Sequence, residues 1–138
     1  MKNIVAQISE IRGLKNELHG RDFLLTWDKS LDDLKIILKV ARALKMLHHG
    51  NLSCRLFDSG LAVSQFRDNS TRTRFSFASA ANLLGLSVQD LDEGKSQVAH
   101  GETVRETANM ISFLTEAIGI RDDIFLGAGH AYMLEVGK

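Results

Sequence analysis

A short polar stretch in the middle of the chain concentrates side chains that bind anions. Five consecutive residues carry either a hydroxyl or a guanidinium group: Ser70, Thr71, Arg72, Thr73 and Arg74. Hydroxyl groups donate hydrogen bonds to phosphate oxygens, and the planar fork of an arginine matches the geometry of a phosphate. The spacing therefore predicts a phosphate-binding turn, with a plain helix cap formed by the serine as the alternative.

The residues on either side place this turn at the start of a helix. Residues 61–66 form a short apolar run typical of a strand, and residues 75–84 have the alanine-rich spacing of a helix that ends at Gly85. Backbone N–H groups at a helix start are unpaired and attract anions. The helix dipole disfavours arginines at that end, so a bound anion would relieve the conflict.

The rest of the chain alternates between helical spacing and short apolar runs. Helices are expected in residues 3–18, in residues 30–49, from Glu102 or Thr103 onward, and close to Lys138. Strands are expected in residues 52–57 and 61–66, from residue 86 onward, and in either 119–121 or 124–126. This alternation predicts an α/β fold with a parallel sheet and helices on both faces, which binds ligands at the carboxyl ends of its strands.

The helix expected after Ser30 has the clearest local signals. Ser30 and Asp33 have the spacing of a capping box, and Gly50 is a suitable end. One apolar stripe is predicted to face the core, formed by Leu34, Ile37, Leu38, Ala41 and Leu44.

Composition excludes several classes of function. The 138 residues suffice for one domain, and 17 basic side chains balance 17 acidic ones, which argues against nucleic-acid and membrane-surface partners. No apolar run approaches the ~20 residues of a membrane span. The single Cys54 cannot form an internal disulfide, so the cytoplasm is expected. The histidines lack the spacing of a zinc site and no nucleotide-binding glycine turn is present, so neither metal nor cofactor is expected.

Three blocks of sequence resemble the aspartate/ornithine carbamoyltransferase family: residues 70–74, 96–103 and 117–121. Residues 91–95 and the second block most resemble its YgeW-type branch. The resemblance covers nearly the whole chain from Asp22 onward and matches the N-terminal, carbamoyl-phosphate-binding half of the family. Residues 1–138 are therefore expected to be that domain. The family's later His-Pro-x-Gln element and its amino-acid-binding half have no counterpart, so we expect a truncated fragment that is inactive alone.

The resemblance implies a reaction in which an amine of an amino-acid-like substrate attacks the carbonyl carbon of carbamoyl phosphate and phosphate leaves. It implies that Ser70, Thr71, Arg72 and Thr73 bind the phosphate. It also implies that Arg121, together with Thr73, binds and polarises the carbonyl oxygen. The remaining arginine of the turn, Arg74, is expected to form a structural salt bridge.

The resemblance further implies that Gln97 and His100 bind substrate from a loop that enters a neighbouring subunit of a homotrimer. Considered without the family, the same loop is a solvated surface loop. Glu102 is expected to cap the following helix, where a carboxylate suits the dipole. The alternative to an enzyme of amino acid metabolism is a phosphate-binding or oligomer-forming module without transferase activity.

Overall fold

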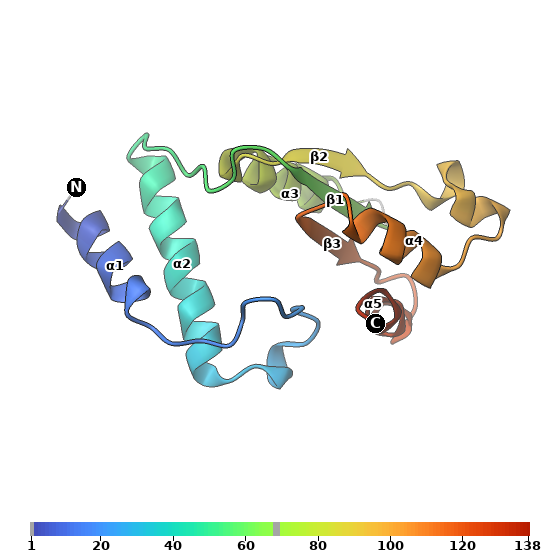
Figure 1. Ribbon diagram of the computed structural model, residues 1–138, viewed down its shortest axis with the longest axis horizontal. Coiled ribbons are helices and arrows are strands. Elements are labelled where there is room, and N and C mark those ends of the chain that lie inside the picture. The colour runs from blue at the N-terminus through green and yellow to red at the C-terminus, as the bar shows by residue number, and fades with distance from the viewer. Residues whose placement is uncertain (1, 68–69) are drawn as a thin grey trace. The chain divides into compact units, whose positions relative to one another are not determined.

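A computed structural model describes residues 2–67 and 70–138 of the chain (Figure 1). The chain divides into two compact units, Met1–Cys54 and Arg55–Lys138. The first unit contains the helices α1 (Lys2–Arg12) and α2 (Leu31–His49), and a short 3₁₀ turn at Thr26–Asp28. The second unit contains, in chain order, β1 (Leu61–Phe66), α3 (Thr71–Leu84), β2 (Ser87–Asp90), two 3₁₀ turns (Glu93–Lys95 and Gln97–His100), α4 (Val104–Ser112), β3 (Ala117–Arg121) and α5 (Ala128–Val136).

In the first unit, α2 begins and ends as its sequence predicts. The Ser30 hydroxyl accepts a hydrogen bond from the backbone N–H of Asp33 at 3.1 Å, and Gly50 follows the last turn. The predicted apolar stripe is wrong, because Ile36 and Ala43 are buried whereas Leu38 is 69% exposed. Apolar residues surround most of this helix, so their period does not select one face. Among the described residues, no helix is both long and apolar enough to cross a membrane.

Two other expectations for the N-terminal part are corrected. The first helix ends at Arg12, well before the predicted boundary at residue 18. The predicted strand over residues 52–57 is absent from the described chain, because that segment pairs with no strand. Instead, the backbone N–H groups of Leu56 and Phe57 both donate to the Leu84 carbonyl at the end of α3, each at 3.0 Å.

The second unit contains a parallel sheet in the order β2-β1-β3. Ala62 of β1 lies opposite Val88 of β2 and Ala117 of β3. Because β1 has a neighbour on each side and helices above and below, five of its six residues are buried. The α/β fold with a parallel sheet is thus confirmed, and the third strand is the first of the two alternatives, near residues 119–121.

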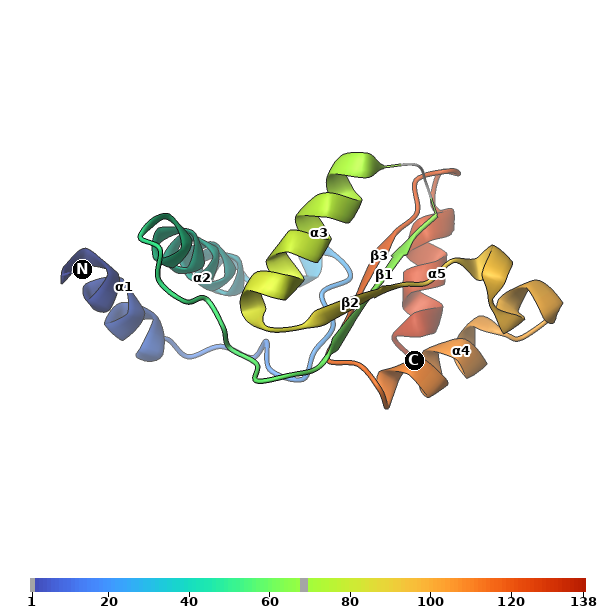
Figure 2. The ribbon, with the colours of Figure 1, turned by 90° about the horizontal axis from the view of Figure 1, so that it is seen from above.

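Helices cover both faces of this sheet (Figures 1 and 2). The α3 helix lies on one face, and α4 and α5 lie on the other. The chain moves from β1 outward to β2 and then back across β1 to β3, so crossovers of one hand put α3 and α4 on opposite faces. Because β1 leads into α3 and β3 leads into α5, on opposite faces, the loops that follow these two strands diverge at the carboxyl edge, which is where sheets of this kind leave room for a ligand.

Small residues let α3 approach the sheet closely. Ala62, Ala81 and Leu86 form the buried centre, and Phe77 packs against it. A Cβ atom on Gly119 would lie 2.5 Å from the Phe77 ring, so the ring occupies the space that the glycine leaves open. This packing fixes the distance between α3 and the sheet.

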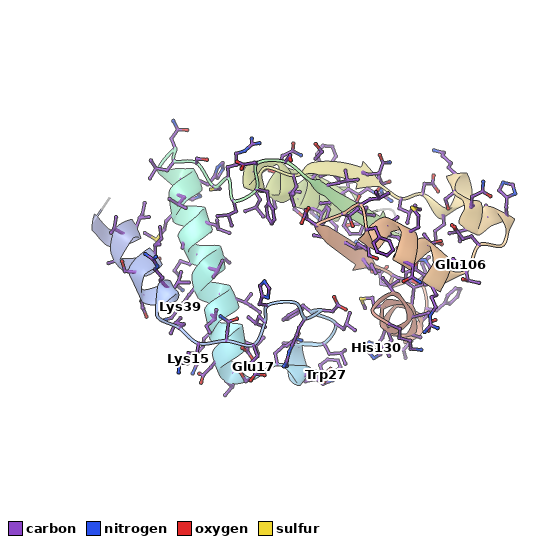
Figure 3. All side chains as sticks on the ribbon, viewed as in Figure 1. Lys15, Glu17, Trp27, Lys39, Glu106 and His130 are labelled. Atoms are coloured by element: carbon purple, nitrogen blue, oxygen red, sulfur yellow. The ribbon has the colours of Figure 1, made fainter. Side chains whose placement is uncertain are left out.

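Local caps fix where α4 begins. The Thr103 hydroxyl accepts from the Glu106 N–H, and the Glu106 carboxylate accepts from the Thr103 N–H at 2.8 Å. Glu106 is labelled at the start of this helix in Figure 3. These hydrogen bonds lower the pKa of Glu106 below its ordinary value. The expectation that Glu102 caps this helix is wrong. Its carboxylate instead accepts from the Thr107 hydroxyl at 2.8 Å, because the neighbouring threonine already occupies the cap.

The end of α3 generates a testable prediction about stability. Gly85 has a φ of +102°, and a Cβ there would overlap the Phe57 carbonyl oxygen. Gly101 has a similar φ of +100° with open space around it. Gly101→Ala should lose about 1–2 kcal/mol of unfolding free energy from backbone strain alone, whereas Gly85→Ala should lose clearly more. Urea unfolding of both variants measures the difference, and equal losses would contradict the predicted overlap.

Candidate functional site

The predicted anion-binding turn lies at the carboxyl end of β1, at the first turn of α3. The Ser70 hydroxyl accepts from the backbone N–H of Thr73 at 3.4 Å and shares a hydrogen bond with the Thr73 hydroxyl at 2.8 Å. The cap function of Ser70 is therefore confirmed. This cap function and a role in anion binding are compatible, because the hydroxyl lies among the unpaired N–H groups of the helix start. Asp68 and Asn69, which precede it, lie outside the described residues.

The end of β3 brings Arg121 to this turn. Its Nη1 donates to the Thr73 hydroxyl at 3.2 Å, and its Nη2 pairs with the Asp123 carboxylate at 2.7 Å. Two residues 48 positions apart in the sequence thus meet because β1 and β3 are parallel neighbours. A guanidinium and a hydroxyl that converge on one place can both bind an oxygen atom that carries negative charge.

Thr71 and Arg72 occupy the first turn of α3 and are exposed. No hydrogen bond or ion pair joins the Arg72 guanidinium to another residue of the described chain. A positive charge at a helix start is unfavourable when no anion is near it. The position of this side chain therefore suits an incoming anionic ligand.

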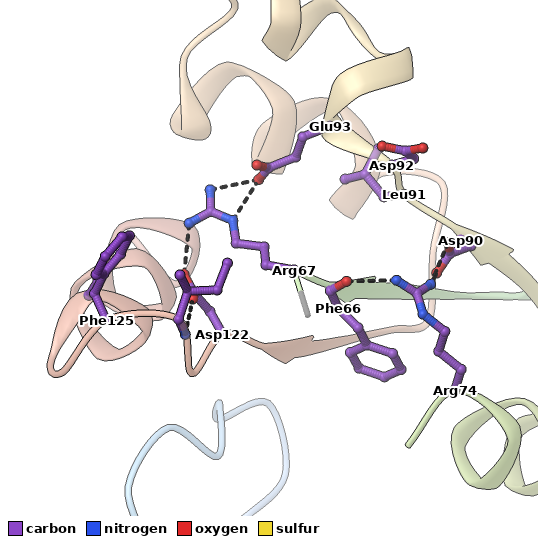
Figure 4. A pocket seen from close by; sticks show the side chains of 11 residues that line it. Phe66, Arg67, Arg74, Asp90, Leu91, Asp92, Glu93, Asp122 and Phe125 are labelled. Atoms are coloured by element: carbon purple, nitrogen blue, oxygen red, sulfur yellow. Dashed lines mark hydrogen bonds and ion pairs between the residues drawn. The ribbon is translucent and has the colours of Figure 1, made fainter. Parts of the chain in front are cut away.

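Arg74, by contrast, is fully engaged by the protein. Its Nη1 contacts both carboxylate oxygens of Asp90, at 2.6 and 2.7 Å, and its Nη2 donates to the Phe66 carbonyl at 2.7 Å (Figure 4). The structural salt bridge expected for this arginine is confirmed. It ties the first turn of α3 to the carboxyl ends of β1 and β2.

A second charged cluster, which sequence reasoning did not identify, adjoins this salt bridge. Arg67 extends between Glu93 and Asp122 (Figure 4), beside an open pocket of about 680 Å³. Burial alone would lower the pKa of Arg67, but its hydrogen bonds to the two carboxylates outweigh this effect and raise the pKa. Burial also raises the pKa of Tyr132, whose ring lies 3.8 Å from the guanidinium. No local spacing signals the cluster, because its members lie far apart in the sequence.

The loop between β2 and α4 holds the other two predicted site residues. Gln97 and His100 are exposed in a 3₁₀ turn that extends away from the start of α3 (Figure 2). Within the described residues, no hydrogen bond or ion pair connects either side chain with Ser70, Thr73 or Arg121. The structure therefore brings together Ser70, Thr73 and Arg121 but not these two.

The described residues contain no group of three or more His, Cys, Asp or Glu side chains placed to hold a metal ion. The acidic residues near the site have other partners, since Asp90, Glu93 and Asp122 each accept from an arginine. Basic groups and hydroxyls thus dominate the chemistry available at the turn.

Comparison with known proteins shows which family this chain matches. The family model described as "Aspartate/ornithine carbamoyltransferase, carbamoyl-P binding domain" matches residues 21–137. The Escherichia coli (strain K12) protein named "Putative carbamoyltransferase YgeW" is 66% identical over 137 residues, which are 99% of this chain and 35% of that protein. A catabolic ornithine carbamoyltransferase of Treponema denticola is 32% identical over 115 residues, 83% of this chain and 34% of its own length.

Solved structures show the same relationship. An ornithine carbamoyltransferase from Pyrococcus furiosus superposes with a TM-score of 0.76 at 29% identity, over 88% of this chain and 37% of that one. The chain thus spans about a third of the length of the curated relatives that it matches.

The different surroundings of Arg72 and Arg74 predict different effects on stability. Arg74→Ala leaves Asp90 and the Phe66 carbonyl without their shared donor and should lose roughly 1 kcal/mol of unfolding free energy, a value reduced by partial exposure. Arg72→Ala should change it by less than about 0.5 kcal/mol. Parallel denaturant titrations test this, and a larger loss for Arg72→Ala would contradict the assignment of structural and ligand-facing arginines.

Proposed function

This chain belongs to the aspartate/ornithine carbamoyltransferase family, and from this membership we propose that it binds carbamoyl phosphate for transfer of the carbamoyl group to an amine. The observation that carries the proposal is the contact of Arg121 with the Thr73 hydroxyl at 3.2 Å, directly at a helix start rich in unpaired N–H groups. One end of this small site suits a phosphate and the other suits a carbonyl oxygen.

The phosphate end is assigned to the first turn of α3. Ser70, Thr71 and Thr73 offer hydroxyls beside the backbone N–H groups, and Arg72 supplies a positive charge that no described residue neutralises. Carbamoyl phosphate is a doubly charged anion, so its binding would also offset the repulsion between the arginine charge and the positive end of the helix dipole.

The carbonyl end is assigned to Arg121 and Thr73. When an amine attacks the carbonyl carbon, negative charge develops on the carbonyl oxygen, and the bond from carbon to the phosphate oxygen then breaks. Donors held in place before the reaction stabilise this charge, and a single such donor is typically worth about 3–4 kcal/mol. No covalent intermediate with the protein is needed, because positioning the two reactants already removes much of the barrier.

The second substrate is proposed to be an amino-acid-like amine. Ornithine carbamoyltransferases are among the relatives, and one structurally similar protein is an aspartate transcarbamoylase described in complex with carbamoyl phosphate. Because the chain spans about a third of such relatives, only carbamoyl phosphate binding is assigned to these residues. Transfer is assigned to the whole protein, and we expect no turnover by the 138 residues alone. The cytoplasm, where phosphorylated metabolites and a free buried Cys54 are both stable, is the proposed location.

The loop that bears Gln97 and His100 is proposed to complete the site of a neighbouring copy in a homotrimer. This proposal is motivated by the exposure of both side chains and by the direction of the loop, away from the start of α3 (Figure 2). A closed ring gives every copy both a turn and a loop to share.

Titration calorimetry with carbamoyl phosphate and with inorganic phosphate tests the proposed ligand. The wild-type chain should bind carbamoyl phosphate, and Arg72→Ala should weaken binding about tenfold to hundredfold because a charge-assisted hydrogen bond to phosphate is lost. Arg105→Ala is a matched control, since Arg105 holds the same position in the first turn of α4. Equal affinity of the wild type for both ligands would favour a phosphate-binding module without transferase chemistry.

Mixing two defective variants tests the shared site. Arg72→Ala chains lack an intact turn, and His100→Ala chains lack an intact loop, so both should bind carbamoyl phosphate weakly. In randomly mixed trimers, about a quarter of the interfaces combine an intact turn with an intact loop and should bind tightly. Native mass spectrometry establishes whether mixed rings form. If they form without any tight sites, the loop does not serve a neighbour, and a purely monomeric chain would contradict the trimer itself.

A further inference from the structure

Arg67 joins three segments that meet at the carboxyl edge of the sheet. It is the first residue after β1, and its side chain is 26% exposed. Its Nε and Nη2 both donate to one carboxylate oxygen of Glu93, at 3.0 and 2.7 Å, while Nη1 donates to Asp122 at 2.9 Å (Figure 4). One guanidinium therefore holds the loop after β2 and the loop after β3 at a fixed separation.

The segments that carry these two carboxylates also carry residues of the proposed site. Asp122 follows Arg121 in the sequence, and the Arg67 backbone N–H donates to the Arg121 carbonyl at 3.0 Å. On the other side, the Ser96 hydroxyl and N–H both donate to the Glu93 carbonyl, at 3.0 and 3.2 Å. Ser96 in turn caps the 3₁₀ turn that begins at Gln97.

Buried groups keep this connection rigid. Gln65 is 2% exposed and donates to the same Glu93 oxygen at 2.6 Å, and it also hydrogen-bonds the Tyr132 hydroxyl. The Tyr132 ring stacks on the Arg67 guanidinium at 3.8 Å. Asp122 is 4% exposed and also accepts from the Ile124 N–H at 3.3 Å. The Arg67 guanidinium thus has hydrogen-bond partners along its edges and an aromatic ring on one face, which leaves it little freedom to rotate.

We propose that Arg67 is a positioning residue, which holds the backbone that carries Arg121 and the loop that carries Gln97 in the geometry required for the carbamoyl group. This role rests on the proposed function. A partly buried ion pair adds little net stability compared with apolar packing, but its geometry is specific. The contacts of the Arg67 side chain lie at Glu93, Asp122 and Tyr132, and within the described residues none reaches Ser70 or Thr73. Its removal should therefore disturb the carbonyl end of the site more than the phosphate end.

The test compares two ligands and two loops in the intact 138-residue chain. Arg67→Lys keeps the charge but cannot bridge both carboxylates. It should weaken carbamoyl phosphate binding by about tenfold in calorimetry while leaving the affinity for inorganic phosphate unchanged. Amide hydrogen exchange should become faster in residues 91–101 and 121–126 but not in α3. Arg105→Lys, at an exposed arginine that pairs with Glu135, is the matched control and should change none of these values.

Two further variants remove the contacts of the Arg67 guanidinium one at a time. They also serve in place of Arg67→Lys if that variant does not fold. Glu93→Gln should accelerate exchange in residues 91–101, and Asp122→Asn should do so in residues 121–126. Equal weakening of both ligands, or unchanged binding and exchange, would overturn the positioning role. If the wild type binds no carbamoyl phosphate, the proposed function fails by itself. Amide hydrogen exchange then tests the connection through Arg67 without a ligand. Unchanged exchange in residues 91–101 and 121–126 of these variants would overturn it.

Discussion

The burial of β1 between two parallel neighbours is the constraint on which the second unit depends. Parallel pairing brings the carboxyl ends of all three strands to one edge, from which the chain continues into α3 on one face and into α5 on the other. The turn at Ser70 follows β1 and Arg121 is the last residue of β3, so both lie at that edge. The start of α3 and the side chain of Arg121 meet there because Phe66 and Arg121 are paired in register.

Several arginines lie at this edge. Their partners distinguish those with a structural role from the one that is proposed to bind the ligand. Asp90 and the Phe66 carbonyl engage Arg74, while Glu93 and Asp122 engage Arg67. Arg72 has no such partner among the described residues and is exposed at a helix start, where a cation is unfavourable without an anion. Carboxylates thus hold the supporting arginines in place, so that the field of the helix start remains available to a ligand.

The sequence predicts the fold class and several local features correctly. The cap by Ser70 and the end of α3 at Gly85 depend on residues within or next to one turn. The sequence also predicts a structural salt bridge for Arg74, but not its partner Asp90, which lies 16 positions away on β2. Two failures are tertiary: residues 52–57 are apolar enough for a strand but pair with no strand of the described chain, and α2 has too many apolar positions to reveal its buried face. The Arg67 cluster could not be found because Gln65, Glu93, Asp122 and Tyr132 converge only once the sheet has formed. The roles of the site residues toward a ligand stay predictions.

The two parts of the proposed site differ in how firmly the fold holds them. The turn at Ser70 is fixed by the sheet and by the packing of Phe77 against Gly119, so its N–H groups are in place before any ligand arrives. The segment that contains Gln97 and His100 is exposed, and its connection to the sheet passes through Glu93 and the Leu91 N–H, which donates to the Ser64 carbonyl at 2.8 Å. This difference suits the proposed transfer, because a charged reactant needs donors that are in place before it binds, and the turn at the sheet edge supplies them.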